Sequence, residues 1–386
     1  MNRFIDKPMH NRPENFAGGG EPPPGSRGYR FRLIDAVAVV IVLGVLVALL
    51  LPTIHDGRTP GRRIQCTNNL KQIGLGIHNL HDTFNGIPPL ALGDSRASFF
   101  VMIMPFCEAQ NVYNLYNGGN QQANTSIENA IDGSTVDPVA AWTALSDTER
   151  NAAGSIKYMS CPGRRSGIQQ IPMNGAANLY AGPLGDYAVV FIDQDPSDRF
   201  PFKIPNPDVS PKTGWQLHQD PCDPQQVNRQ KGAIRLADVD CSDPSAAAYK
   251  NWKPRDTFAR LIDGMANTLV VGEKHIRKGE LGKYSASQDD QDGVYTFTSK
   301  TGGRNYNVAR NLGLPLVDGL DDKRFVRRQS PAKGPHANFG FGSPHSSGVQ
   351  FLRADGSVTI LNPNMDEQIK RRLGHTQDGL ETELSP

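Results

Sequence analysis

A nearly unbroken apolar run close to the N-terminus constrains this chain more than any other feature. From Ala36 to Leu51 every residue is apolar or glycine, and Pro52, Thr53 and Ile54 extend the uncharged run to 19 residues. A bilayer-spanning helix needs about 20 residues, whereas the apolar region of a secretion signal has about 7 to 15. No small-x-small cleavage site follows, because the chain continues as HDGRTPGRR. The run therefore predicts a retained membrane anchor, with a fully buried soluble helix as the alternative.

The residues around this run predict its orientation. Arginines flank it on both sides: Arg27, Arg30 and Arg32 precede it, and Arg58, Arg62 and Arg63 follow it. A first helix with basic residues before it usually keeps its N-terminus inside. We therefore expect residues 1–27, which are rich in Pro and Gly, to be a disordered cytoplasmic leader. Residues 28–56 would form the transmembrane helix and residues 62–386 the exported head.

The composition excludes several classes of function. The formal net charge is only +2, so no overall field favours nucleic acid as a partner. With 39 Gly and 29 Pro, the chain has more turn formers than average, which indicates long loops. No Gly-x-Ser-x-Gly elbow, P-loop, HExxH or kinase signature is present. We expect no catalytic residue, no cofactor and no enzyme activity.

The stretch after the apolar run predicts a second helical segment. Its apolar residues recur at spacings of three and four, as on one face of a helix: Cys66, Leu70, Ile73, Ile77, Leu80 and Phe84. The sequence NGIPP ends this pattern, because proline lacks the amide that a helix needs. Between the two segments lie Gly57, Pro60 and Gly61. Each weakens a helix, so we expect a break or kink there.

Two stretches near the C-terminus hold candidate ligands. VQFL and SVTIL predict a hairpin whose tight turn is Asp355-Gly356, with His345 as a hydrogen-bonding residue where the strand begins. The hairpin could bring His345 near Asp355, but a third ligand is not evident. In the predicted strand TLVVGE and the residues after it, Glu273 and His275 would face the same side. Two side chains do not make a site, and we predict no metal centre.

Several sequence blocks together resemble the bacterial family DUF1559. The resemblance begins at FRLIDAVAVVIVLGVLVALLLP and RRIQCTNNLKQIGLGIHNLHDTFNGIPP. It continues through SFFVMIMPFCEAQNVYNLYN, MSCPG, GDYAVV and LIDGMANTLVVGEKH, and ends at FGSPHSSGVQFLRADGSVTIL. In that last block His345, nine residues and Asp355-Gly356 reproduce the family's His-x9-Asp-Gly motif. The segment from about 193 to 250 matches no block, so we interpret it as a variable, loop-rich insertion.

The resemblance implies an α+β, pilin-like fold. A long N-terminal helix, half of it in the membrane, would carry an exported head built on an antiparallel β-sheet. Family members begin with a prepilin-type segment, which is cut after a glycine that directly precedes a phenylalanine. Here Arg30 precedes Phe31, and the acidic residue of the mature segment is Asp35 rather than a glutamate. We therefore interpret the segment as a tether, and as an assembly helix only if Phe31 proves to be an N-terminus.

The resemblance also sets the expected role and location. It implies a pilin-like structural or interaction protein in the cytoplasmic membrane, related to type IV pilins and type II secretion, which could assemble with copies or other chains through its N-terminal helix. A tethered solute- or ligand-binding domain is the alternative. An exported head permits disulfides. Cys222 and Cys241 are the first candidate pair, Cys66 and Cys161 the second, and Cys107 is left over; the sequence alone does not settle the pairing.

Overall fold

The computed structural model describes residues 32–93, 96–116, 138–171, 182–192, 220–242, 252–276, 281–282, 294–296, 307–313, 316–319, 340–377 and 379. The leader, Arg30 and Phe31 lie outside these residues, as does most of the 193–250 segment. The chain divides into two compact units, with the boundary between Asp56 and Gly57. Within the part of the chain that is described, no helix combines the length and apolarity that crossing a membrane requires.

Helix α1 is one continuous element from Leu33 to Phe84, 52 residues long. The predicted break at Gly57, Pro60 and Gly61 is therefore wrong, since all three positions are helical. Helix propensity is a weak preference that tertiary contacts override. Such a contact is made directly after Gly61, where the carbonyl of Arg63 accepts a hydrogen bond from the side-chain amide of Gln350 at 3.2 Å.

The predicted amphipathic face of this helix is confirmed. Cys66, Leu70, Ile73, Ile77 and Leu80 are all buried. Glycines on the same segment allow close packing of their neighbours. A Cβ at Gly74 would lie 3.0 Å from a methyl group of Leu352, and a Cβ at Gly76 would overlap the sulfur of Cys107. The Gly-Leu-Gly sequence here is thus part of the core.

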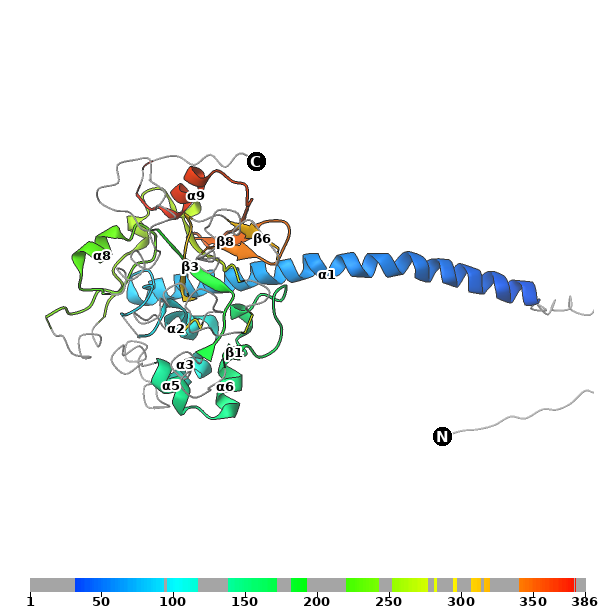
Figure 1. Ribbon diagram of the computed structural model, residues 1–386, viewed down its shortest axis with the longest axis horizontal. Coiled ribbons are helices and arrows are strands. Elements are labelled where there is room, and N and C mark those ends of the chain that lie inside the picture. The colour runs from blue at the N-terminus through cyan, green and yellow to red at the C-terminus, as the bar shows by residue number, and fades with distance from the viewer. Residues whose placement is uncertain are drawn as a thin grey trace, which may run out of the picture. The chain divides into compact units, whose positions relative to one another are not determined.

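Short helices and 3-10 turns surround α1 in the second unit (Figure 1). The α-helices are α2 (Phe99–Ile103), α3 (Gln110–Tyr116), α5 (Pro138–Ala144), α6 (Asp147–Ala153), α8 (Pro224–Arg229) and α9 (Glu367–Gly374). The 3-10 turns are η1 (Met104–Cys107), η3 (Lys157–Met159), η6 (Phe258–Arg260) and η7 (Met265–Asn267). Helix α6 begins with a capping box, in which the Ser146 hydroxyl accepts the Glu149 amide and the Glu149 carboxylate accepts the Ser146 amide.

A five-stranded sheet forms the centre of this unit. Its strands are β3 (Tyr187–Phe191), β4 (Leu269–Glu273), β5 (Ala309–Asn311), β8 (Val349–Arg353) and β9 (Val358–Leu361), in the order β5-β3-β4-β8-β9. All neighbours are antiparallel except β5, which pairs parallel to β3. Two-stranded pairs flank it: β1 (Gln170–Ile171) with β2 (Gly182–Pro183), and β6 (Val317–Asp318) with β7 (Gly342–Ser343). The fold is α+β, and the sheet is mainly antiparallel.

The two faces of the sheet belong to different cores. Along β3, Tyr187, Val189 and Phe191 pack in a cluster with Leu70 and Ile73 of α1. The alternate residues Ala188 and Val190 join a second cluster that contains Leu373 of α9. This alternation is the two-residue period of a strand. Helix α1 therefore covers one face of the sheet, and α9 packs against the other.

Candidate functional site

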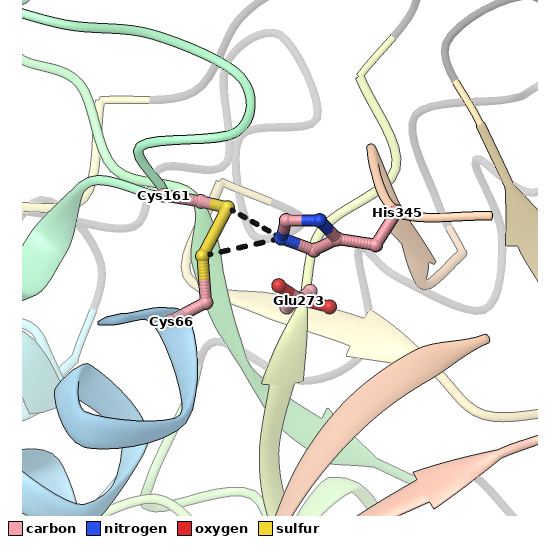
Figure 2. A group of neighbouring side chains, drawn as sticks. All are labelled: Cys66, Cys161, Glu273 and His345. Atoms are coloured by element: carbon pink, nitrogen blue, oxygen red, sulfur yellow. Dashed lines mark hydrogen bonds between the residues drawn. A yellow bond between two sulfur atoms is a disulfide. The ribbon is translucent and has the colours of Figure 1, made fainter. Parts of the chain in front are cut away.

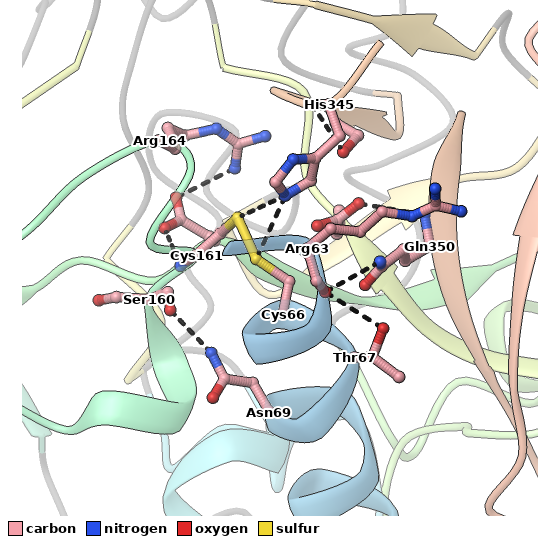
Figure 3. The surroundings of a disulfide bond; sticks show 12 residues. Arg63, Cys66, Thr67, Asn69, Ser160, Cys161, Arg164, His345 and Gln350 are labelled. Carbon is pink, nitrogen blue, oxygen red and sulfur yellow. Dashed lines mark hydrogen bonds and ion pairs between the residues drawn. A yellow bond between two sulfur atoms is a disulfide. The ribbon is translucent and has the colours of Figure 1, made fainter. Parts of the chain in front are cut away.

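A buried disulfide joins the C-terminal half of α1 to a loop far along the chain. Cys66 is bonded to Cys161, 95 residues later, and neither side chain is exposed. Cys161 lies in the loop after η3, and Cys66 is the first buried residue along the described part of α1. Neighbouring contacts hold the two elements together: the Asn69 side-chain amide donates to the Ser160 carbonyl at 2.8 Å (Figure 3). The same amide donates to the Tyr187 hydroxyl at 3.2 Å.

His345 lies directly against this disulfide. Its Nε2 is 3.5 Å from the Cys66 sulfur and 3.6 Å from the Cys161 sulfur (Figure 2). Burial, together with the positive charges of Arg164, Arg63 and Arg62, lowers the pKa of His345 to about 4. The imidazole is therefore neutral at neutral pH. Gly163 makes this approach possible, because a Cβ there would lie 2.7 Å from Cε1 of the ring.

Glu273 supplies a carboxylate to the same place. The residue ends strand β4, is fully buried and points toward the imidazole and the disulfide (Figure 2). Its Oε2 accepts a hydrogen bond from the backbone amide of Gln350 at 3.0 Å, while Oε1 has no hydrogen-bond partner in the described part of the chain. Burial raises the pKa of Glu273 to about 7, against the opposing effects of the Gln350 amide, the Ser343 hydroxyl and Arg164. Near neutral pH this carboxyl is thus poised between its two protonation states.

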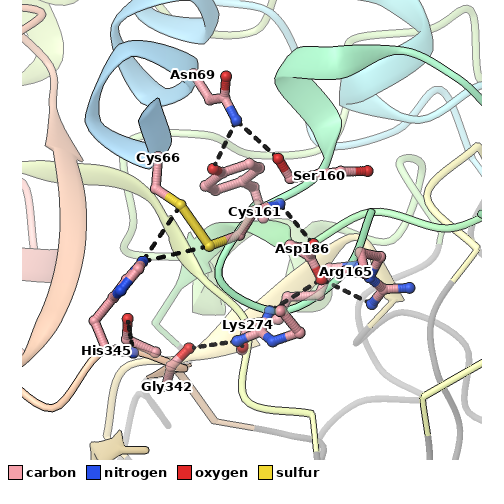
Figure 4. Close-up of polar contacts among 12 residues, drawn as sticks. Cys66, Asn69, Ser160, Cys161, Arg165, Asp186, Lys274, Gly342 and His345 are labelled. Carbon is pink, nitrogen blue, oxygen red and sulfur yellow. Dashed lines mark hydrogen bonds and ion pairs between the residues drawn. A yellow bond between two sulfur atoms is a disulfide. The ribbon is translucent and has the colours of Figure 1, made fainter. Parts of the chain in front are cut away.

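A buried ion-pair network fixes the loop that carries Cys161. Asp186 accepts the Cys161 amide at 2.7 Å and pairs with Arg164 at 3.0 Å and Arg165 at 2.7 Å. Arg164 also donates to the carbonyl of Lys274, which directly follows Glu273, and to that of Gly342, three residues before His345. Figure 4 shows Asp186 beside Cys161 and Arg165. Burial alone would raise the pKa of Asp186, but Arg165, Arg164 and the Cys161 amide bring the pKa below its usual range. The network therefore holds an ionised aspartate inside the protein.

The second disulfide has a different setting. Cys222 is bonded to Cys241, only 19 residues later, and both side chains are exposed. Its neighbouring contacts are local: the Cys222 backbone amide donates to the Asp220 carboxylate at 2.9 Å, and the Cys241 sulfur lies 3.5 Å from the Val239 carbonyl oxygen. The two bonds are the two pairings that the sequence analysis named as candidates. Cys107 keeps a free, buried thiol, and burial raises its pKa to about 12.

The other residues singled out from the sequence lie elsewhere. Strands β8 and β9 form the predicted hairpin, with Gly356 at a φ of 83° in its turn. Asp355 accepts the Ser357 amide at 2.8 Å in that turn, and it is not part of the group around His345. His275 is buried but likewise lies outside that group. The sequence analysis considered His345 with Asp355 and Glu273 with His275, and it did not consider His345 together with Glu273.

The site brings together segments that are far apart in the chain. Cys66, Cys161, Glu273 and His345 each lie in one of the sequence blocks that carry the family resemblance. The spacings alone gave no metal or catalytic signature, because no two of the four residues are close in sequence. A signal that could have pointed to the site is that these blocks, taken together, contain four residues of metal-ligating types: Cys66, Cys161, Glu273 and His345.

The comparisons with known proteins agree with the sequence resemblance. A family model described as a protein of unknown function, DUF1559, matches residues 56–368. This match includes both disulfides, the sheet and all four residues of the buried cluster. Searches of curated proteins and of solved structures each gave no match.

Proposed function

The chain belongs to the DUF1559 family, and we propose that it is a pilin-like structural or interaction protein tethered to the membrane by its N-terminal helix. One observation carries the proposal: every described side chain from Leu33 to Leu46 is exposed, although the stretch contains only one charged residue, Asp35. Examples are Val40 at 66% and Ile41 at 60% exposure. A helix that is apolar on all sides requires an apolar surrounding.

The length of the apolar run favours a bilayer as that surrounding. The uncharged residues from Ala36 to Ile54 number 19, and α1 is helical over all of them. At about 1.5 Å per residue such a helix extends about 28 Å, close to the roughly 30 Å of a hydrocarbon core. The arginines on both sides would lie at the two interfaces.

Asp35 fits an interfacial position at the start of this helix. Its carboxylate accepts the backbone amide of Arg32 at 3.0 Å, in the first turn of α1. A carboxylate there satisfies a free amide and lies at the positive end of the helix dipole. This gives Asp35 a local partner without a new N-terminal amine, and it supports a permanent tether over a processed assembly helix.

The head then acts as the exported part of the protein. Its attachment to α1 is extensive, because Leu70, Ile73, Ile77 and Leu80 lie in the main core and Cys66 is covalently bonded to the Cys161 loop. The C-terminal part of α1 is thus an integral part of the head. The head surfaces that meet a partner would therefore be presented outside the cell membrane.

Fractionation of the full chain from a bacterial host tests the proposal. We expect the protein in the membrane fraction and resistant to extraction by high salt. Leu43→Arg combined with Leu46→Arg should release it, because each arginine near the centre of a span costs about 2.5–3.5 kcal/mol. The matched control is Ile64→Arg combined with Leu75→Arg, at positions 62% and 64% exposed on the same helix but beyond the run. Recovery of the unaltered chain in the soluble fraction would refute the tether, as would equal behaviour of the two double variants.

A further inference from the structure

Four metal-ligating atoms converge in the buried cluster. The sulfurs of Cys66 and Cys161, one carboxylate oxygen of Glu273 and one ring nitrogen of His345 all lie within 4.8 Å of one another. In a tetrahedral zinc site with bonds of about 2.0–2.3 Å, neighbouring ligand atoms lie about 3.3–3.8 Å apart. The cluster is therefore close to the dimensions of such a site. After the S–S bond is broken, the two sulfurs must move apart, and ligand atoms that lie up to 4.8 Å apart must approach by up to about 1 Å, to reach these dimensions.

A structural disulfide does not account for the other two groups. A neutral imidazole nitrogen faces both sulfurs, and a buried carboxylate with an unpartnered oxygen, Glu273 Oε1, points to the same place (Figure 2). An unsatisfied buried carboxylate oxygen is costly, and in native proteins such an atom calls for a partner. A cation coordinated at the centre of the cluster would satisfy it.

We propose that reduction of the Cys66–Cys161 disulfide converts this cluster into a zinc site. The ligands are Cys66 Sγ, Cys161 Sγ, His345 Nε2 and the Glu273 carboxylate. Two sulfurs, one imidazole and one carboxylate suit Zn²⁺, which takes four such ligands in tetrahedral geometry. In the oxidised protein both sulfurs are used in their own bond, and the site does not form.

The conversion balances with a dithiol as the reductant. The dithiol gives two electrons and two protons to the disulfide and is itself oxidised to a cyclic disulfide. The S–S bond breaks, and Cys66 and Cys161 become thiols. Zn²⁺ then binds their thiolates, and the two thiol protons pass to the solvent. Reoxidation by any disulfide oxidant reverses the steps and releases the metal.

The surroundings of the cluster favour the metal-bound state. The positive charges of Arg62, Arg63 and Arg164 act at this cluster, where they stabilise thiolates and a carboxylate. Backbone contacts hold the ligands in position: the Cys161 amide donates to Asp186 and the His345 amide donates to Ser343 at 3.2 Å. Such outer contacts orient the ligands of a metal site.

Zinc titration of the full chain in detergent tests the proposal. The chain is reduced with a dithiol until all five cysteines titrate as thiols, and the reductant is then removed without air. Zinc is added in competition with a chromophoric chelator. We expect about one tightly bound zinc per reduced chain and none at that affinity in the oxidised chain. Absence of tight binding to the reduced chain, or equal binding to both, would overturn the proposal.

Two double variants and one single variant locate the zinc. The chain with Cys222→Ser and Cys241→Ser should bind zinc like the unaltered protein, and the chain with Cys66→Ser and Cys161→Ser should not bind it. His345→Ala should weaken binding by more than about 100-fold, because even outer partners of a ligand contribute about 10–100-fold. Zinc retained without Cys66 and Cys161 would refute the assignment. The comparison of the oxidised and reduced chains needs no variant, and its result is independent of whether the N-terminal helix enters a membrane.

Discussion

The two disulfides of this protein show how differently the same bond can be used. Cys66–Cys161 is fully buried, spans 95 residues and lies against an imidazole and a carboxylate. Cys222–Cys241 is exposed, spans 19 residues and is surrounded by contacts within its own loop. The first joins α1 to the loop after η3 and lies beside two metal-ligating side chains, whereas the second closes a local loop. Only the first has the setting of a chemical site.

Removal of each disulfide is the strongest test of this difference. In the chain-entropy description, a bond that closes 95 residues stabilises the fold by about 4.7 kcal/mol and one that closes 19 residues by about 3.2 kcal/mol. Cys66→Ser with Cys161→Ser should therefore lower the free energy of unfolding more than Cys222→Ser with Cys241→Ser. Urea unfolding of the head in the full chain measures both. An equal loss, or a larger loss at Cys222–Cys241, would contradict the structural role given to the buried bond.

The second-largest expected difference between the surroundings of the two disulfides is in how the stability of the protein depends on pH. The pKa of Glu273 is about 7 in the folded chain against an ordinary 4.5, so the folded state binds more protons in this interval. Relative to Glu273→Gln, the unaltered oxidised chain should lose about 3 kcal/mol of stability as pH rises from about 4.5 to about 7. His345, with its pKa lowered to about 4, acts in the opposite direction, but it is present in both chains.

Asp240, beside the exposed disulfide, provides the contrast. Hydrogen bonds from the Ser242 hydroxyl and amide lower its pKa. Stability from Asp240 is therefore present above its unfolded pKa and is lost as pH falls through the lower, folded pKa. Denaturant unfolding at a series of pH values should thus give opposite slopes for Glu273→Gln and Asp240→Asn, each relative to the unaltered chain. Slopes of the same sign would show that the buried carboxyl is not held in the environment described.

Substitution of Gly163 should have the smallest effect of the three. A methyl group there would lie 2.7 Å from Cε1 of His345, so the ring must move. Crowding of this kind typically costs about 1–3 kcal/mol. Gly163→Ala should lower the unfolding midpoint and weaken zinc binding by the reduced chain. Gly61→Ala, at a helical position with open space around it, should instead stabilise the helix by up to about 1 kcal/mol. Unchanged stability and zinc affinity in Gly163→Ala would mean that the imidazole does not depend on this glycine.

Local patterns in the sequence predicted the individual elements well. The three- and four-residue spacing from Cys66 to Leu80 gave the buried face of α1, and the Asp355-Gly356 turn gave the β8–β9 hairpin. Each of these signals lies within a single element. The continuity of α1 through Pro60 was missed, because contacts made beyond Gly61 outweigh local propensity.

The arrangement of the elements could not be derived in the same way. Periodicity shows which side of a strand is buried, but not which strand lies beside it, so the parallel pairing of β5 with β3 was not foreseen. The same reason hid the cluster. Its four groups come from α1, a loop, the end of β4 and the segment before β8, and only the folded sheet brings them together.

X-ray absorption at the zinc edge of the reduced, zinc-loaded chain tests the central claim most directly. We expect the zinc to have two sulfur neighbours at about 2.3 Å and two nitrogen or oxygen neighbours at about 2.0–2.2 Å. The sulfur contribution should be lost in the chain with Cys66→Ser and Cys161→Ser. The variant that lacks Cys222 and Cys241 should give the spectrum of the unaltered chain. A shell of nitrogen and oxygen alone, or sulfur neighbours that disappear with Cys222 and Cys241, would contradict a zinc site built at the buried disulfide.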